Sequence, residues 1–278
     1  SQMLEKFPNS AVLYNIAGAS NAGLMQFDAA IDKYKQSLKI KPDYAKAYNN
    51  MAVALNHKGD SKAAVDSCQQ ALKIEPDYAD AYINMGIALN DQGDRDAAID
   101  SYKQALKINP LDAEVYNNMG VALRDKGDLM AAIESCKQSL KINPDFAEAY
   151  YNMGNALSDI GDIKAAISSF KQALKINPNY EKAYYNMGNT LNDKGDLEAA
   201  INSYKQAIKI KPEYVEAYIN MGLALKDKGD LEAAIEIYKQ ALKIKPDYAE
   251  AYYNKSLVNL CLQDFEAGWS LYEWRWKL

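Results

Sequence analysis

The sequence predicts an all-α fold, a solenoid of stacked helix pairs. All eight prolines are spaced by 34 residues, from Pro8 to Pro246. Tyrosine recurs at the same interval from Tyr14 to Tyr252, and twelve of the fourteen glycines occupy two positions of the repeat. A single helix pair cannot bury both of its apolar faces, so neighbouring pairs must stack along the chain.

The stretch Ala149–Asp162, AYYNMGNALSDIGD, illustrates the first helix of each unit. Its apolar residues recur at i, i+3, i+4 and i+7, which is the spacing of a buried helical stripe. The stripe consists of Tyr150, Met153, Gly154 and Leu157. Gly161 can adopt the turn conformation that ends this helix, and Asp162 is placed to cap the next one.

The second helix follows that turn and has an apolar face of its own. It is predicted to bury Ile163, Ala166, Ile167, Phe170 and Ala173. It ends before Pro178, because proline lacks a backbone donor and disfavours helical geometry in the preceding residue. We number the repeat from Ala147 as position 1. Small residues at positions 8 and 20, here Gly154 and Ala166, predict that neighbouring helices approach closely.

The repeat divides the chain into three segments. Residues 1–10 are predicted to end a preceding repeat, 11–248 to form seven complete units, and 249–278 to form an eighth, atypical and truncated unit. The last unit departs from the pattern where Arg275 takes a position that is otherwise small. It also holds the only tryptophans of the chain, Trp269, Trp274 and Trp276. Such an end is either a cap or a junction to another domain, and we favour the junction.

The pattern Tyr-x-x-Met-Gly, then Gly-Asp, alanine, an aromatic residue, alanine and proline, resembles the tetratricopeptide repeat (TPR) over almost the whole chain. The resemblance implies a right-handed superhelix, with first helices lining a concave groove and second helices on the convex side. The array is similar to the superhelical TPR region of O-linked N-acetylglucosamine transferases and related bacterial proteins, whose groove carries an asparagine ladder. The C-terminal tail resembles the segment that joins TPR arrays to a catalytic domain in bacterial glycosyltransferase-like proteins.

Asparagine occupies position 6 in seven units, although it is an indifferent helix former. These residues are Asn50, Asn84, Asn118, Asn152, Asn186, Asn220 and Asn254. Successive helical residues rotate by about 100°, so position 6 faces away from the buried stripe and is expected to form a ladder along the groove. An amide offers a donor and an acceptor and can hold the backbone of an extended peptide. The alternative is a solvated or interhelix-bonding side chain.

A second row on the same face is acidic at position 13. It consists of Asp91, Asp125, Asp159, Asp193 and Asp227. Over positions 2, 12 and 13 there are ten acids and four bases, a balance that favours a ligand carrying lysine or arginine. Tyr151 and Tyr185, next to the asparagines at position 5, are candidates to pack on ligand side chains. The alternative is a solvated face whose acids serve only solubility.

Other classes of function have little support in the sequence. There is no catalytic motif and no cofactor motif, and the acidic rungs are too far apart to converge on one metal ion. The net charge of −5 argues against nucleic acid as a partner, and no run of eighteen apolar residues is available for a membrane span. Cys68 and Cys136 are predicted to be core fillers at position 24. The sparse cysteines and the lack of a signal peptide indicate a cytoplasmic protein.

The sequence therefore predicts a non-enzymatic scaffold for protein–protein interaction. Its groove is expected to bind an extended peptide that is basic or neutral. One alternative is a structural spacer, or a module that forms homo-oligomers through apolar helix faces at the solenoid ends. Another is a substrate-recruiting region of a larger glycosyltransferase-like enzyme.

Overall fold

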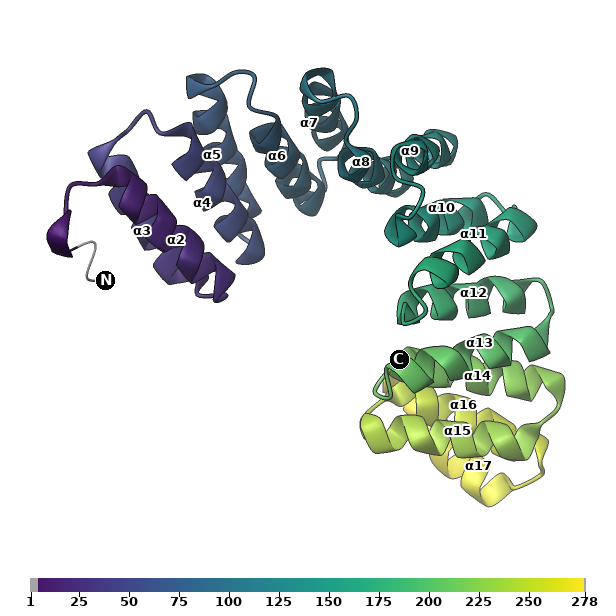
Figure 1. The fold of residues 1–278 in the computed structure, drawn as a ribbon. Coiled ribbons are helices and arrows are strands. Elements are labelled where there is room, and N and C mark those ends of the chain that lie inside the picture. Colours follow the sequence, from purple (N-terminus) through teal and green to yellow (C-terminus); the bar gives the residue numbers. More distant parts are fainter. Residues whose placement is uncertain (1–4, 278) are drawn as a thin grey trace. The chain divides into compact units, whose positions relative to one another are not determined.

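The computed structural model describes residues 5–277, and every regular element in that range is helical (Figure 1). The helices belong to two compact units, of which the first ends at Pro144 and the second begins at Asp145. In both units each helix packs on the next one along the chain, as α4, α5 and α6 do. Alternate first helices also touch, for example α4 with α6 and α12 with α14. This arrangement is the predicted all-α solenoid.

From Ala11 onward, the N-terminal unit contains four helix pairs. They are α2 (Ala11–Gly23) with α3 (Phe27–Ile40), α4 (Ala45–His57) with α5 (Ser61–Ile74), α6 (Ala79–Gln92) with α7 (Arg95–Ile108), and α8 (Ala113–Lys126) with α9 (Leu129–Ile142).

The C-terminal unit also has four pairs, and a short 3-10 helix follows them. The elements are α10 (Ala147–Asp159) with α11 (Ile163–Ile176), α12 (Glu181–Asp193) with α13 (Leu197–Ile210), α14 (Val215–Lys228) with α15 (Leu231–Ile244), α16 (Ala249–Cys261) with α17 (Phe265–Tyr272), and η1 (Glu273–Lys277).

The turn between the two helices of a pair forms as the Gly-Asp motif predicts. Gly161 has a φ of +82°, and the Asp162 carboxylate accepts a hydrogen bond from the backbone N–H of Ala165 at 3.1 Å. Two turns adopt the same left-handed conformation at a residue other than glycine, Met25 (φ 59°) and Gln263 (φ 63°). A left-handed L-residue costs about 1–2 kcal/mol, so these two turns are strained.

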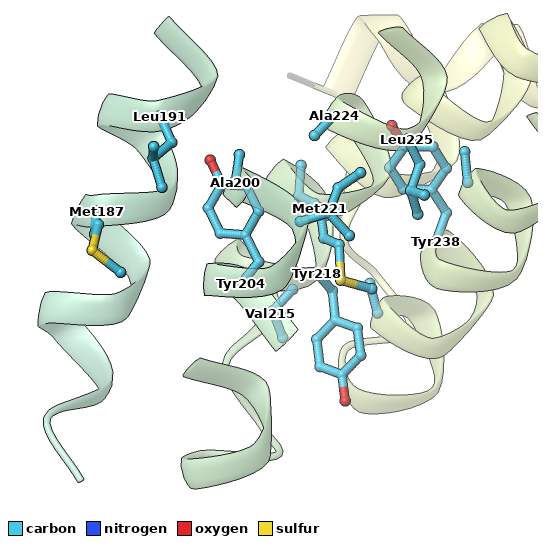
Figure 2. Packing of buried hydrophobic residues seen from close by; sticks show 14 of the residues in the cluster. Met187, Leu191, Ala200, Tyr204, Val215, Tyr218, Met221, Ala224, Leu225 and Tyr238 are labelled. Atoms are coloured by element: carbon cyan, nitrogen blue, oxygen red, sulfur yellow. The ribbon is translucent and has the colours of Figure 1, made fainter. Parts of the chain in front are cut away.

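Glycine at position 8 lets the aromatic ring at position 24 lie directly on the backbone of the first helix. A Cβ added to Gly188 would lie 2.6 Å from Cε1 of Tyr204, whose side chain is almost fully buried. Figure 2 shows Met187 and Leu191 of α12 pointing toward this ring. The same contact recurs at Gly18, Gly86, Gly154 and Gly222. The close approach predicted from small residues is therefore a ring-on-glycine contact in these five pairs.

Cysteine replaces the ring in two repeats. Cys68 and Cys136 are buried, as the core-filler interpretation predicts, and burial raises the pKa of each thiol to about 12. The repeat with Cys68 has Ala52 in place of glycine at position 8. A thiol occupies less space than a ring, and the extra methyl group is therefore tolerated there.

The C-terminal end keeps the repeat as far as the buried Gly268 and then changes. The α-helical α17 gives way to η1, in which Trp274 stacks on Tyr252 with ring centroids 4.2 Å apart. The Arg275 guanidinium lies 4.4 Å from the ring centroid of Tyr272. A large guanidinium thus stands on an aromatic ring at the position where other repeats have a small residue. The division of this segment from the seven preceding units, and its role as a junction, stay predictions.

The ring-on-glycine contact predicts a large effect for Gly188→Ala. The added methyl group overlaps the Tyr204 ring, and overpacking of this kind costs about 1–3 kcal/mol. The urea midpoint of unfolding, followed by circular dichroism, should fall accordingly. Gly23→Ala is the matched control, because a Cβ there meets nothing within 4 Å. An equal effect of both substitutions would contradict this account of the packing.

Candidate functional site

The position-6 asparagines of the N-terminal unit donate hydrogen bonds between repeats. Nδ2 of Asn50 donates to Oδ1 of Asn15 at 3.0 Å, and Nδ2 of Asn84 donates to Oδ1 of Asn49 at 2.9 Å. The acceptor in each case is the position-5 residue of the preceding repeat. Asn15 and Asn49 are themselves buried, so each bond joins two first helices at their interface.

The C-terminal unit uses the same register with a different acceptor. Nδ2 of Asn186 donates to the Tyr151 hydroxyl at 3.0 Å and to Oδ1 of Asn155 at 2.8 Å. One repeat later the corresponding residues are Asn220, Tyr185 and Asn189. A primary amide has two N–H groups, and both are used here.

The interhelix role that the sequence left open is therefore observed at Asn50, Asn84, Asn186 and Asn220. Of the other three, Asn118 and Asn152 are half-buried and Asn254 is 8% exposed. At the four bonded positions the nitrogen is directed into the repeat interface. At Asn186 and Asn220, where both N–H groups are used, the amide oxygen is the atom left for a further hydrogen bond.

Each of the two candidate tyrosines packs its ring on the tyrosine that caps the next first helix. The Tyr151 ring centroid lies 4.9 Å from that of Tyr180, and the Tyr185 centroid lies 4.9 Å from that of Tyr214. Both side chains are half-buried. Burial raises the pKa of Tyr185 above its usual value, so the hydroxyl stays neutral and can accept the bond from Asn220. Contact of either ring with a ligand stays a prediction.

The five aspartates at position 13 are all exposed, at the ends of successive first helices. Position 12, beside them, holds a feature that the sequence analysis missed. The Oδ1 atoms of Asn56, Asn90 and Asn192 are buried and accept no hydrogen bond from any residue between 5 and 277. The sequence feature that could have indicated two of these unpaired oxygens is an asparagine directly before an acidic residue, as in Asn90-Asp91 and Asn192-Asp193.

In the C-terminal unit these groups surround a small cavity of about 190 Å³. Its walls are Asn189, Asn192, Asp193, Tyr204, Asn220 and Leu223. The Asp193 carboxylate and the unpaired Asn192 oxygen are both acceptors, and the Asn220 nitrogen is already engaged. The cavity therefore suits a hydrogen-bond donor such as an ammonium, a guanidinium or an amide N–H.

His57, in the position-13 row, stacks on Phe27 with ring centroids 5.0 Å apart. Between residues 5 and 277 there is neither a cluster of three side chains suited to a metal ion nor a helix long and apolar enough to cross a bilayer.

Family models for tetratricopeptide repeats match the chain without a gap from residue 26 to residue 260. The matches to the model described as TPR repeat cover 26–59, 122–161, 188–229 and 222–260, and those to models described as tetratricopeptide repeat cover 43–110, 101–134, 147–180 and 169–202. The chain belongs to the tetratricopeptide repeat family. No curated protein matches it.

Several solved structures resemble this TPR protein. The crystal structure of MamA is 35% identical, with a TM-score of 0.55, over 60% of this chain and 97% of MamA. The Cut9–Hcn1 hetero-tetramer of the APC/C is 17% identical, with a TM-score of 0.70, over 92% of this chain and 50% of the other. YrrB, described as a TPR protein with an unusual peptide-binding site, is 23% identical, with a TM-score of 0.55, over 69% and 98%. The last two likenesses show the fold alone.

Two position-24 tyrosines of the TPR array differ in how their hydroxyl groups are satisfied. The Tyr204 hydroxyl donates to Oδ1 of Asn189 at 2.8 Å. The Tyr238 hydroxyl is buried and has no partner among the described residues, because Leu223 stands where Asn189 stands one repeat earlier. An unpaired buried hydroxyl costs about 1–3 kcal/mol.

We expect the corresponding phenylalanine substitutions to have opposite effects. Tyr204→Phe removes a hydrogen bond and should lower the free energy of unfolding by about 0.5–1.5 kcal/mol. Tyr238→Phe removes an unpaired hydroxyl and should leave stability unchanged or raise it. Each variant is the control for the other, because both changes delete one oxygen from an equivalent site. Equal destabilisation by both, measured from urea unfolding curves, would refute the assignment.

Proposed function

We propose that this protein is a scaffold whose first-helix face binds an extended, donor-rich segment of a partner protein. The first-helix face is defined here by positions 6, 12 and 13 of the repeat. The segment carries lysine or arginine side chains together with backbone N–H groups. The sequence alone allowed a basic or a neutral peptide, whereas the acceptors on this face favour a basic one.

The main support for this proposal is the orientation of the position-6 amides, whose N–H groups point toward the preceding repeat. Asn186 and Asn220 each donate both N–H groups to the preceding repeat, which leaves the amide oxygen as the available atom. The exposed carboxylates of position 13 lie on the same helices. A face on which acceptors outnumber the basic side chains of Arg124 and Lys226 attracts donors and repels carboxylates.

Two further points support this function. TPR arrays are interaction modules, and YrrB is described as having a peptide-binding site. Each surface contact contributes only about 0.5–1.5 kcal/mol net, so useful affinity requires contacts from several repeats. A repeat array supplies equivalent contact residues at regular spacing.

The test uses two fluorescein-labelled probe peptides, one of alternating lysine and serine and one of alternating glutamate and serine. Fluorescence anisotropy should detect binding of the lysine peptide only. In Asp193→Asn/Asp227→Asn the affinity should fall about two- to tenfold, because an exposed charge pair contributes about 0.2–1 kcal/mol.

The matched control is Glu198→Gln/Glu232→Gln, which removes two exposed carboxylates from the first turns of α13 and α15. This variant should bind the lysine peptide as the unaltered protein does. Preference for the glutamate peptide, or an equal loss in the control, would contradict the proposal.

A second candidate function is self-association through the ends of the array. The N-terminal unit exposes Val12 and Ile16 on α2, and the C-terminal unit exposes Trp269 and Trp276. Apolar patches of this kind favour association. Concentration-dependent light scattering separates this function from monomeric binding of a segment.

The relationship to O-linked N-acetylglucosamine transferases and the recruitment of substrates for a glycosyltransferase-like enzyme stay predictions. So does the cytoplasmic location, which the buried thiols of Cys68 and Cys136 support, since neither forms a disulfide.

A further inference from the structure

Ion pairs between second helices and the following repeat occur in a fixed register. Lys58 at position 14 contacts Asp28 at position 18 of the preceding repeat, and Lys126 contacts Asp96 in the same way. In both pairs the hydrogen bond to the aspartate raises the pKa of the lysine. Positions 18 and 14 of successive repeats are thus close enough for direct charge pairing.

In the C-terminal unit this register holds two lysines. Lys164, in the first turn of α11, takes position 18, and Lys194, at the end of α12, takes position 14. They line a cavity of about 400 Å³ together with Ile167, Ser168 and Lys171. Residues 164, 168 and 171 are spaced by four and three, which places them on one face of the helix. Three lysine side chains and Ser168 therefore line one opening.

These positive charges are only partly neutralised by the protein. Lys164 and Lys171 form no ion pair with any residue in the described range of the chain. Lys194 lies 4.0 Å from Asp196, whose carboxylate also caps α13 by accepting from the backbone N–H of Ala199. Of the three lysines only Lys194 has an ion-pair partner among the described residues, so the group carries an excess of positive charge, which an anion would offset.

We propose that this cavity binds a phosphate-type oxyanion, either a free phosphate compound or a phosphoryl group on a partner protein. The anion replaces the aspartate that completes the equivalent register at Lys58 and Lys126. Ammonium groups bind phosphate oxygens through charge-assisted hydrogen bonds, and the Ser168 hydroxyl adds a neutral donor. The site is formed by α11 and by Lys194 at the end of α12, and it uses none of the positions 6, 12 and 13 that define the first-helix face of the proposed function.

Isothermal titration calorimetry with pyrophosphate at constant ionic strength tests the site. Lys164→Glu recreates the acid–lysine pair with Lys194, so the variant should fold and should bind pyrophosphate at least about tenfold more weakly. Lys171→Gln should also weaken binding without adding a pair. The matched control is Lys62→Glu, because Lys62 occupies position 18 in a repeat whose partner, Gln92, is neutral. This control should keep the affinity within about twofold.

An O-phosphoserine peptide in a second titration distinguishes the sources of the oxyanion. Tighter binding of the peptide than of pyrophosphate indicates a phosphorylated partner, and the reverse order indicates a free anion; both orders support the site. Absence of pyrophosphate binding to the unaltered protein would overturn the proposal. An equal loss in Lys164→Glu and Lys62→Glu would overturn it as well, because it would indicate general charge attraction.

Discussion

In the pairs with glycine at position 8, a side chain at position 24 of the second helix lies against the backbone of the first helix, and the other contacts of the array depend on this approach. Where the side chain is a ring, as at Tyr204 on Gly188, a Cβ at position 8 would overlap it. The approach sets the distance between the two helices and therefore the faces that remain for the next repeat. Residues at positions 5 and 6 then come into register with their equivalents in the neighbouring pair, where they meet as donor and acceptor.

This geometry gives the first-helix face its chemical character. A row of amides with both the N–H groups and the oxygen unengaged would bind donors and acceptors alike. Where both N–H groups are engaged between repeats, as at Asn186 and Asn220, the amide presents its oxygen, and the aspartates at position 13 add negative charge. Under the proposed function, the bonds that hold the repeats together also restrict which ligand the face accepts. A substitution at position 6 should then affect both stability and binding.

The fold was predictable because its determinants are local and recur every 34 residues. The turn at Gly161, the cap at Asp162 and the buried cysteines all follow from patterns within one repeat. The bonding of Asn186 was not predictable in the same way, because it depends on Tyr151 and Asn155 in the preceding repeat. The unpaired hydroxyl of Tyr238 depends on Leu223, fifteen residues away, and the Lys164–Lys194 register likewise joins two repeats. Pairings between repeats require the spacing and rotation of the stack, which periodicity alone does not supply.

The position-6 asparagine links neighbouring repeats, whether or not a ligand is bound. A double-mutant cycle on Asn220 and Tyr185 tests it most directly, using Asn220→Ala, Tyr185→Phe and the double variant in urea unfolding. Phenylalanine keeps the ring that packs on Tyr204 and Tyr214 and removes only the hydroxyl that accepts from Asn220. We expect a coupling free energy of about 0.5–1.5 kcal/mol, the net contribution of one hydrogen bond. Additive effects, with coupling below about 0.3 kcal/mol, would contradict the account.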